Sequence, residues 1–157
     1  MKNQTVVILD NIRSVHNVGS IFRTSDTLGI QKIYLVGTTP TPTDRFGRQR
    51  KDLAKVALGA EKNIPWEYES KVETLIEKLQ KECFCIVALE QDSKSLDYKT
   101  VKFSGKTAVV VGNEVRGISS DILKKAHKII EIPLLGKKES LNVSVAFAVA
   151  MFRILDN

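Results

Sequence analysis

Residues 5–29 read TVVILDNIRSVHNVGSIFRTSDTLG and contain one complete strand–turn–helix unit. Residues 5–9 form a β-branched, apolar run with few polar interruptions, which is typical of a strand covered on both faces of a sheet. A short polar turn follows, and apolar residues then recur at helical spacing near residues 18–28. A strand that leads into a helix is the building unit of α/β proteins, so this stretch predicts that class.

The helix in this stretch carries its own start and stop signals. We expect Asn17 to cap its N-terminus and Gly29 to end it in a left-handed conformation. The residues expected to face the core are Ile21, Phe22, Ser25 and Leu28. Gly19 in the first turn has no side chain, so another backbone or a ligand can approach the free N–H groups there.

Arg23 is the residue of this helix that most needs an explanation. The simplest interpretation is a surface arginine that pairs with Asp26, three residues further along the same helix. The alternative is functional, because a guanidinium group offers a planar fork of donors that suits a phosphate group. The segment alone leaves both interpretations open.

The rest of the chain repeats the alternation of strands and helices. Further strands are predicted at 32–36, 84–89, 107–111 and 128–132, and helices near 50–58, 71–82, 119–126 and 142–155. This order predicts an α/β fold with a mostly parallel sheet and helices on both of its faces. The length of 157 residues suits a single domain, residues 1–157, with a core of its own.

Composition limits the possible classes further. A hydrophobic content of 43% and a charged content of 27% are ordinary for a globular protein and argue against global disorder. No apolar run approaches the roughly 18 residues of a membrane helix, and the N-terminal run is too short for a signal peptide. We therefore expect a cytoplasmic protein without a membrane partner. The net charge of +6 suggests an anionic partner, although basic charge serves solubility equally well.

A second polar segment, VVVGNEVRGIS at 109–119, follows a predicted strand. Ligands of open α/β sheets bind at the carboxyl ends of the strands. Gly112 and Gly117 would let the backbone approach such a ligand, and Glu114 would either bond to it or brace the turn. The GxGxxG pattern of dinucleotide-binding folds is missing, which counts against a Rossmann-type oxidoreductase.

A third segment, IPLLGKKESLNVSVAFAVA at 132–150, joins the last predicted strand to the last helix. Ser140 and Asn142 are good candidates for helix caps. The basic residues Lys137 and Lys138 lie in the loop just before them, where a solvated loop explains them as well as a ligand does.

Together the three segments resemble the SpoU (TrmH-type) ribose methyltransferases, a branch of the SPOUT superfamily. The resemblance covers almost the whole chain and rests on three motifs in the right order. These are Asn17, Gly19 and Arg23; then Gly112, Asn113, Glu114 and Gly117; then Ile132, Pro133, Ser140, Leu141 and Asn142.

This resemblance implies an enzyme that transfers a methyl group from S-adenosylmethionine to a ribose 2′-hydroxyl of RNA. It also implies a C-terminal trefoil knot, a homodimer, and no metal ion. The implied cofactor-binding residues are Leu89, Gly112, Ile132, Ser140 and Leu141, and the implied catalytic residues are Asn17, Arg23, Glu114, Ser140 and Asn142.

The resemblance also suggests Arg23 as the base that removes the hydroxyl proton. A guanidinium group has a pKa above about 12 and stays charged, so this role is chemically unfavourable. Our hypothesis is that Arg23 clamps the phosphate beside the target ribose and that a phosphate oxygen or water takes the proton. Asn17 would then position Arg23 or the ribose, and in a dimer Arg23 could serve the partner's cofactor.

The predicted RNA contacts are Arg23 and the basic residues on and after the proline-containing loop 37–47. They are Arg23, Arg45, Arg48, Arg50 and Lys51, with Phe46 as an aromatic neighbour. A solvated basic face remains the alternative for the loop residues. Without a separate RNA-binding domain, a compact target such as tRNA is favoured over rRNA, and a noncatalytic RNA-binding protein on the same fold remains the rival class.

Overall fold

The computed structural model describes residues 3–156, and within them seven strands form one parallel sheet. The strands are β1 (Gln4–Asp10), β2 (Lys32–Val36), β3 (Trp66–Glu69), β4 (Cys85–Leu89), β5 (Leu96–Asp97), β6 (Lys106–Val111) and β7 (Lys128–Glu131). Their spatial order is β3-β2-β1-β6-β4-β7-β5, and every pair of neighbours runs parallel. The predicted parallel sheet is confirmed.

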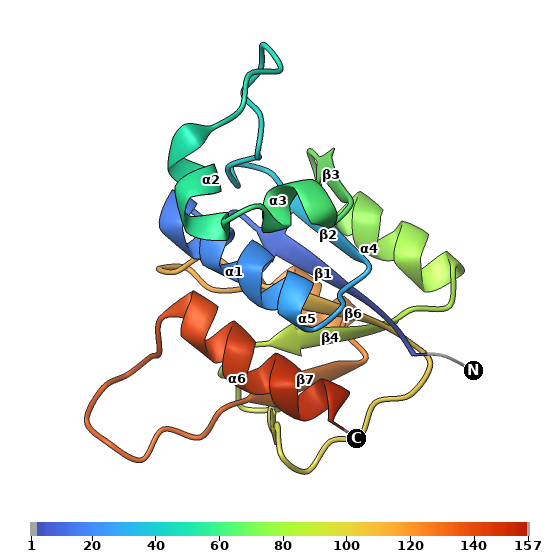
Figure 1. Cartoon of the computed structure of the whole chain (residues 1–157). Coiled ribbons are helices and arrows are strands. Elements are labelled where there is room, and N and C mark those ends of the chain that lie inside the picture. Colours follow the sequence, from blue (N-terminus) through green and yellow to red (C-terminus); the bar gives the residue numbers. More distant parts are fainter. Residues whose placement is uncertain (1–2, 157) are drawn as a thin grey trace.

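Helices cover both faces of this sheet, as the sequence predicts (Figure 1). One face packs against α1 (Val15–Thr27), α2 (Lys51–Ala57), α3 (Ala60–Asn63) and α6 (Val143–Leu155). The other face packs against α4 (Val72–Lys81) and α5 (Ser120–Lys125). Side chains alternate along a strand, so Val7 and Leu9 of β1 belong to the first core and Val6 and Ile8 to the second.

The first helix begins three residues earlier than the expected start at 18. Its N-cap is Ser14, whose Oγ accepts a hydrogen bond of 3.2 Å from the Asn17 N–H. The prediction of Asn17 as the cap was therefore wrong, because a serine three residues upstream takes that position and leaves the Asn17 side chain free for other contacts. Gly29 adopts the predicted left-handed conformation, with φ of +69°.

Gly19 has a packing role. A Cβ atom at this position would lie 2.8 Å from the Cβ of Val56 and 3.1 Å from the carbonyl oxygen of Leu53. Since both residues belong to α2, the missing side chain lets α2 cross α1 in close contact. The sequence left open whether another part of the chain or a ligand would approach Gly19. In the structure, α2 is what lies against it.

Within the described residues, no helix combines the length and the apolar character that crossing a membrane requires.

Candidate functional site

A cleft of about 690 Å³ opens at the carboxyl ends of three neighbouring strands, β4, β6 and β7. Its walls include the five residues that the sequence analysis assigned to cofactor binding: Leu89, Gly112, Ile132, Ser140 and Leu141. They lie at the end of β4, just after β6, just after β7, and in the segment that leads into α6. The volume falls in the range of about 300–1,000 Å³ that is usual for small-molecule sites.

Two glycines shape the floor of this cleft. A Cβ atom on Gly112 would lie 2.7 Å from both the Gly117 carbonyl carbon and the Ile118 Cγ1, so only glycine fits there. Gly117 has a φ of +67°, which favours glycine for a second reason. Asn113 closes the turn, because its Oδ1 accepts hydrogen bonds of 2.9 Å from the N–H groups of Val115 and Arg116.

Glu90 is a cleft residue that sequence reasoning missed. It follows β4 directly, and its carboxylate accepts hydrogen bonds from the Ile118 N–H at 2.9 Å and from the Gln91 N–H at 2.8 Å. The same carboxylate occupies the space that a side chain on Gly117 would need. The available signal was its position, an acidic residue immediately after a buried strand at the ligand-binding edge.

Asn17, Glu114 and Asn142 join the three sequence motifs through one chain of hydrogen bonds. The Asn17 amide donates to Glu114 Oε1 at 3.2 Å, and the Asn17 oxygen accepts from the Asn142 amide at 3.2 Å. Asn142 is also the N-cap of α6, since its oxygen accepts from the N–H groups of Ser144 and Val145 at 2.9 and 3.4 Å. Asn142 thus caps α6 as predicted and holds it to α1.

The Glu114 carboxylate braces the turn before α1. It accepts hydrogen bonds of 3.0 to 3.2 Å from the N–H groups of Arg13 and Ser14. Burial by itself raises the pKa of Glu114, but these bonds, together with its own N–H and the Asn17 amide, outweigh burial and hold the pKa below its ordinary value. Of the two roles open from the sequence, the contacts favour bracing over proton transfer.

Ser140 lies in the exposed approach to α6 and lines the cleft beside Asn142. Arg23, by contrast, does not line the cleft. It lies exposed on α1 beside a separate hollow of about 820 Å³, whose walls also include His16, Lys55 and Phe152. Within residues 3–156, Arg23 forms no ion pair with Asp26. The single chain therefore brings four of the five predicted catalytic residues together and leaves Arg23 apart.

Three of the four arginines predicted to contact RNA gather around a third hollow, of about 740 Å³, whereas Arg23 lies beside the second. Arg48 forms an ion pair with Asp44 at 2.8 Å, and Arg50 forms one with Asp52 at 3.0 Å. The Arg45 guanidinium lies 4.8 Å from the centre of the Phe46 ring. Arg45, Arg48 and Arg50 line this hollow, and Lys51 begins α2 as an exposed neighbour.

Residues 4–152 match the sequence profile of the SpoU rRNA methylase family. The chain belongs to this family. SpoU-family relatives with known names agree with that assignment. A tRNA (guanosine(18)-2′-O)-methyltransferase from Aquifex aeolicus is 32% identical over 150 residues, covering 94% of this chain and 66% of that protein.

Two solved structures of RNA-modifying enzymes share the fold over nearly the full chain. An AdoMet-bound rRNA methyltransferase from Sinorhizobium meliloti is 30% identical with a TM-score of 0.84, covering 98% of this chain and 56% of the other. A TrmH/SpoU tRNA modifying enzyme from A. aeolicus is 27% identical with a TM-score of 0.85, covering 99% and 75%. The chain spans 57–66% of the length of three curated relatives.

Among residues 3–156 of this SpoU-family chain, no group of three histidine, cysteine, aspartate or glutamate side chains lies close enough to hold a metal ion.

Proposed function

We propose that this protein is an S-adenosylmethionine-dependent methyltransferase that acts on ribose 2′-hydroxyl groups of RNA, with tRNA as the expected substrate. One observation carries the proposal. The residues chosen as cofactor ligands from sequence motifs, which lie up to 52 positions apart along the chain, line one cleft at the ligand-binding edge of the sheet.

The cleft fits the cofactor in size and in chemistry. Its volume of about 690 Å³ suits a nucleoside-sized ligand, and Gly112 leaves backbone rather than side chain at the floor. Backbone near Leu89, Ile132 and Leu141, together with the Ser140 hydroxyl, would hold it. When bound, the cofactor supplies an electrophilic methyl group on a sulfonium sulfur. Holding the ribose oxygen in line with that methyl group is the main task left to the protein.

Arg23 would bind the phosphate next to the target ribose with its planar fork of donors. Its permanent charge would stabilise negative charge that develops on the hydroxyl oxygen, while a phosphate oxygen or water accepts the proton. Glu114 is unsuited to that acceptor role, because donors from Arg13, Ser14 and Asn17 already occupy its carboxylate. In this scheme Asn17 and Glu114 position the site and Asn142 caps and orients the last helix.

A homodimer would complete the site. Three exposed apolar residues, Val145, Val149 and Phe152, recur along one face of α6 and are 48%, 39% and 52% exposed. Phe152 lines the same hollow as Arg23. A second copy packed on this face would bury the apolar stripe and would bring Arg23 close to the cleft of its partner, which one protomer alone does not do.

The proposal includes a C-terminal trefoil knot within one methyltransferase domain, residues 1–157. Its support is that residues 139–143 border the same cleft as the loop 112–118, while α6, which follows them, packs beside α1 (Figure 1). Because the proposed substrate is tRNA, the proposal also places the protein in the cytoplasm.

Two assays test the proposed function. Calorimetry with S-adenosylmethionine measures cofactor binding, and transfer of a labelled methyl group to purified tRNA and to rRNA measures the reaction. Mapping of 2′-O-methylation in total RNA with and without the gene then identifies the nucleotide. We expect the labelled methyl group in tRNA. Label in rRNA alone would show that rRNA, and not tRNA, is the substrate. Cofactor binding without label in either RNA would overturn the enzymatic proposal and favour a noncatalytic RNA-binding protein.

A further inference from the structure

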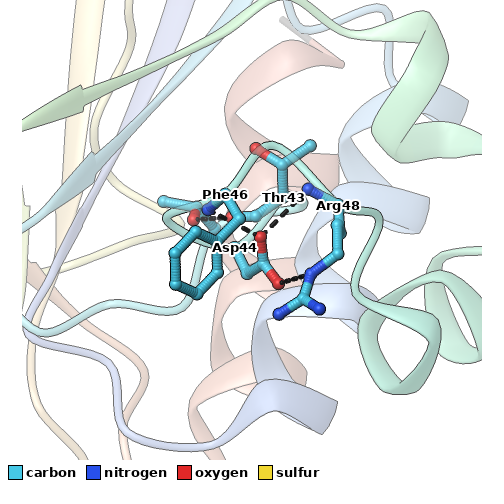
Figure 2. Close-up of polar contacts among 5 residues, drawn as sticks. Thr43, Asp44, Phe46 and Arg48 are labelled. Carbon is cyan, nitrogen blue, oxygen red and sulfur yellow. Dashed lines mark hydrogen bonds and ion pairs between the residues drawn. The ribbon is translucent and has the colours of Figure 1, made fainter.

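The loop between β2 and α2 projects from the body of the molecule (Figure 1), and backbone and side-chain hydrogen bonds cross its tip, residues 43–49. Thr43 and Gln49 pair as a bridge across its base. The Asp44 carboxylate accepts hydrogen bonds from the N–H groups of Phe46 and Arg48 at 2.8 and 3.0 Å and from the Arg48 side chain at 2.8 Å (Figure 2). Gly47 supplies the positive φ of +77° that the turn requires.

These hydrogen bonds shape a tip on which the Phe46 side chain is exposed to solvent. Phe46 is 67% exposed, and the guanidinium groups of Arg45 and Arg48 lie 4.8 and 5.0 Å from its ring centre. Single exposed apolar residues are common and need no special explanation. Here, however, a carboxylate and a glycine fix the backbone around the ring, so the ring is preorganised for contact at little further entropic cost.

Two more aromatic residues, Trp66 and Tyr68, line the hollow beside the tip. Trp66 and Tyr68 are two positions apart on β3, so their side chains share one face of the sheet. They line the same hollow of about 740 Å³ as Phe46, Arg45 and Arg50. We call this hollow the aromatic pocket. β3 is at the edge of the sheet, so the pocket lies several strands away from the cofactor cleft between β6, β4 and β7.

We propose that the aromatic pocket binds an unpaired nucleobase of the RNA substrate, with the adjacent phosphate held by Arg45. This inference rests on the proposed function, because it assigns a recognition subsite to the same reaction. Aromatic faces bind single-stranded bases by stacking, worth about 1–3 kcal/mol per base. Proteins that recognise RNA by sequence use such splayed-out bases, because the edges in a duplex are hard to reach.

The local charges favour an anionic occupant over an apolar peptide, and the aromatic faces favour RNA among the anions. Residues 44–52 contain four cationic side chains and two aspartates, and both aspartates are engaged by Arg48 and Arg50. Within the described chain, Arg45 has no carboxylate partner, so its charge remains available for a phosphate. A planar ligand that carries a phosphate matches both halves of this surface.

Trp66 provides a direct probe, since it is the only tryptophan of the chain. Titration of the full-length protein with bulk tRNA and with octamers of uridine or adenosine should quench its fluorescence by stacking, whereas an RNA duplex of the same length should not. Trp66 fluorescence that is unchanged by all of these RNAs would overturn the proposal and leave the pocket to a protein partner.

Variants of Phe46 test the pocket in the reaction. We expect Phe46→Ala to raise the KM for tRNA about tenfold, which corresponds to about 1.4 kcal/mol of lost stacking. Phe46→Tyr should keep near-normal KM, because the stacking face remains. Leu96→Ala is the matched control, since Leu96 is 50% exposed on β5 at the opposite edge of the sheet. Calorimetry with S-adenosylmethionine should give the same affinity for all four proteins.

The outcomes separate the two proposals. Wild-type protein that methylates tRNA, with Phe46→Ala unchanged in KM and in binding, would overturn the aromatic pocket and leave the methyltransferase intact. Quenching of Trp66 that is lost in Phe46→Ala, without methylation of any RNA, would keep the pocket and overturn the enzyme.

Discussion

Asn142 donates a side-chain hydrogen bond of 3.2 Å to the oxygen of Asn17, which is 125 positions away in the sequence. The same Asn17 side chain donates to Glu114 through its nitrogen. One amide therefore connects the N-terminal ends of the first and last helices to the glycine turn that forms the cleft floor. Each end of this amide has a different partner, so its orientation is fixed by both.

Asn142→Asp tests this connection separately from helix capping. Aspartate caps a helix as well as asparagine does, so we expect the melting temperature to fall by only a few degrees. The new carboxylate can no longer donate to Asn17, and rotating the Asn17 amide to serve it would direct an oxygen at Glu114. We expect at least a tenfold loss of methyl transfer. Asn142→Ala should cost about 1 kcal/mol of stability as well, because the cap is lost; equal activity of Asn142→Asp and wild type would contradict a positioning role.

Glu114→Gln should reveal a pH-dependent contribution to stability. The pKa of Glu114 is lower in the folded protein than its ordinary value of 4.5, so the ionised carboxylate stabilises the fold above about pH 4.5. That stabilisation is lost as the pH falls through the folded-state pKa. Because the side chain is exposed, we expect the difference at pH 7 to be only about 1 kcal/mol. Urea unfolding of both proteins at pH 7, 5 and 3.5 measures it; a difference that stays constant with pH would contradict the role of the charge.

Gly112→Ala should close the cofactor cleft. The added methyl group would meet backbone and the Ile118 side chain at 2.7 Å, which only a shift of the loop 112–118 can relieve. We expect cofactor affinity in calorimetry to fall at least tenfold and stability by about 1–3 kcal/mol, as for other overpacked sites. Gly136→Ala is the control, since a Cβ there meets no atom of the described chain within 4 Å and its φ is not positive. Normal affinity in Gly112→Ala would separate this turn from the cofactor site.

Phe152→Glu should separate the proposed dimer into monomers. The substitution puts a charge into the apolar stripe on α6, which should make burial against a second copy unfavourable by several kcal/mol. Sedimentation equilibrium at micromolar concentration gives the mass. Lys124→Glu, an exposed change on α5 at the opposite face of the sheet, should leave the wild-type mass unchanged. A monomeric wild-type protein would rule out the dimer itself.

Mixed dimers test whether Arg23 works across the interface. In a heterodimer of Arg23→Ala and Ser140→Ala chains, a shared site would pair the intact Ser140 of one subunit with the intact Arg23 of the other. We expect about half of wild-type activity per dimer, although both parental homodimers should be nearly inactive. No recovery in purified heterodimers would assign Arg23 to the cleft of its own subunit.

The elements with strong hydrophobic patterns were predictable from the sequence. The five predicted strands were placed within about one residue of their observed ends, because their apolar, β-branched runs are nearly unbroken. The missed strands, β3 and β5, lie at the two edges of the sheet. β3 reads WEYE, which alternates polar and aromatic residues too briefly to stand out, and β5 has only two residues.

The sequence predicted which residues belong to the candidate site, but it did not predict how those residues contact one another. The resemblance to the SpoU family identified the residues that line the cleft, and the sheet brings them together because the carboxyl ends of adjacent parallel strands lie at one edge. The resemblance could not reveal that Asn17 bonds to Glu114 and Asn142, since the true cap, Ser14, lies in the same polar turn. The exposure of Arg23 agrees with the predicted inward face of α1, which leaves this residue out, but the sequence did not reveal that Arg23 lines a hollow separate from the cleft.

The close crossing of α1 and α2 at Gly19 has a consequence for how a substrate would be chosen. α2 follows directly from the tip that carries Phe46, and α1 carries Arg23, so the crossing fixes the span between these two side chains. An RNA bound at both Phe46 and Arg23 would have to match this fixed distance. Selection would then depend on the number of nucleotides between the anchored base and the modified ribose, and an RNA with one nucleotide inserted there would present the wrong hydroxyl.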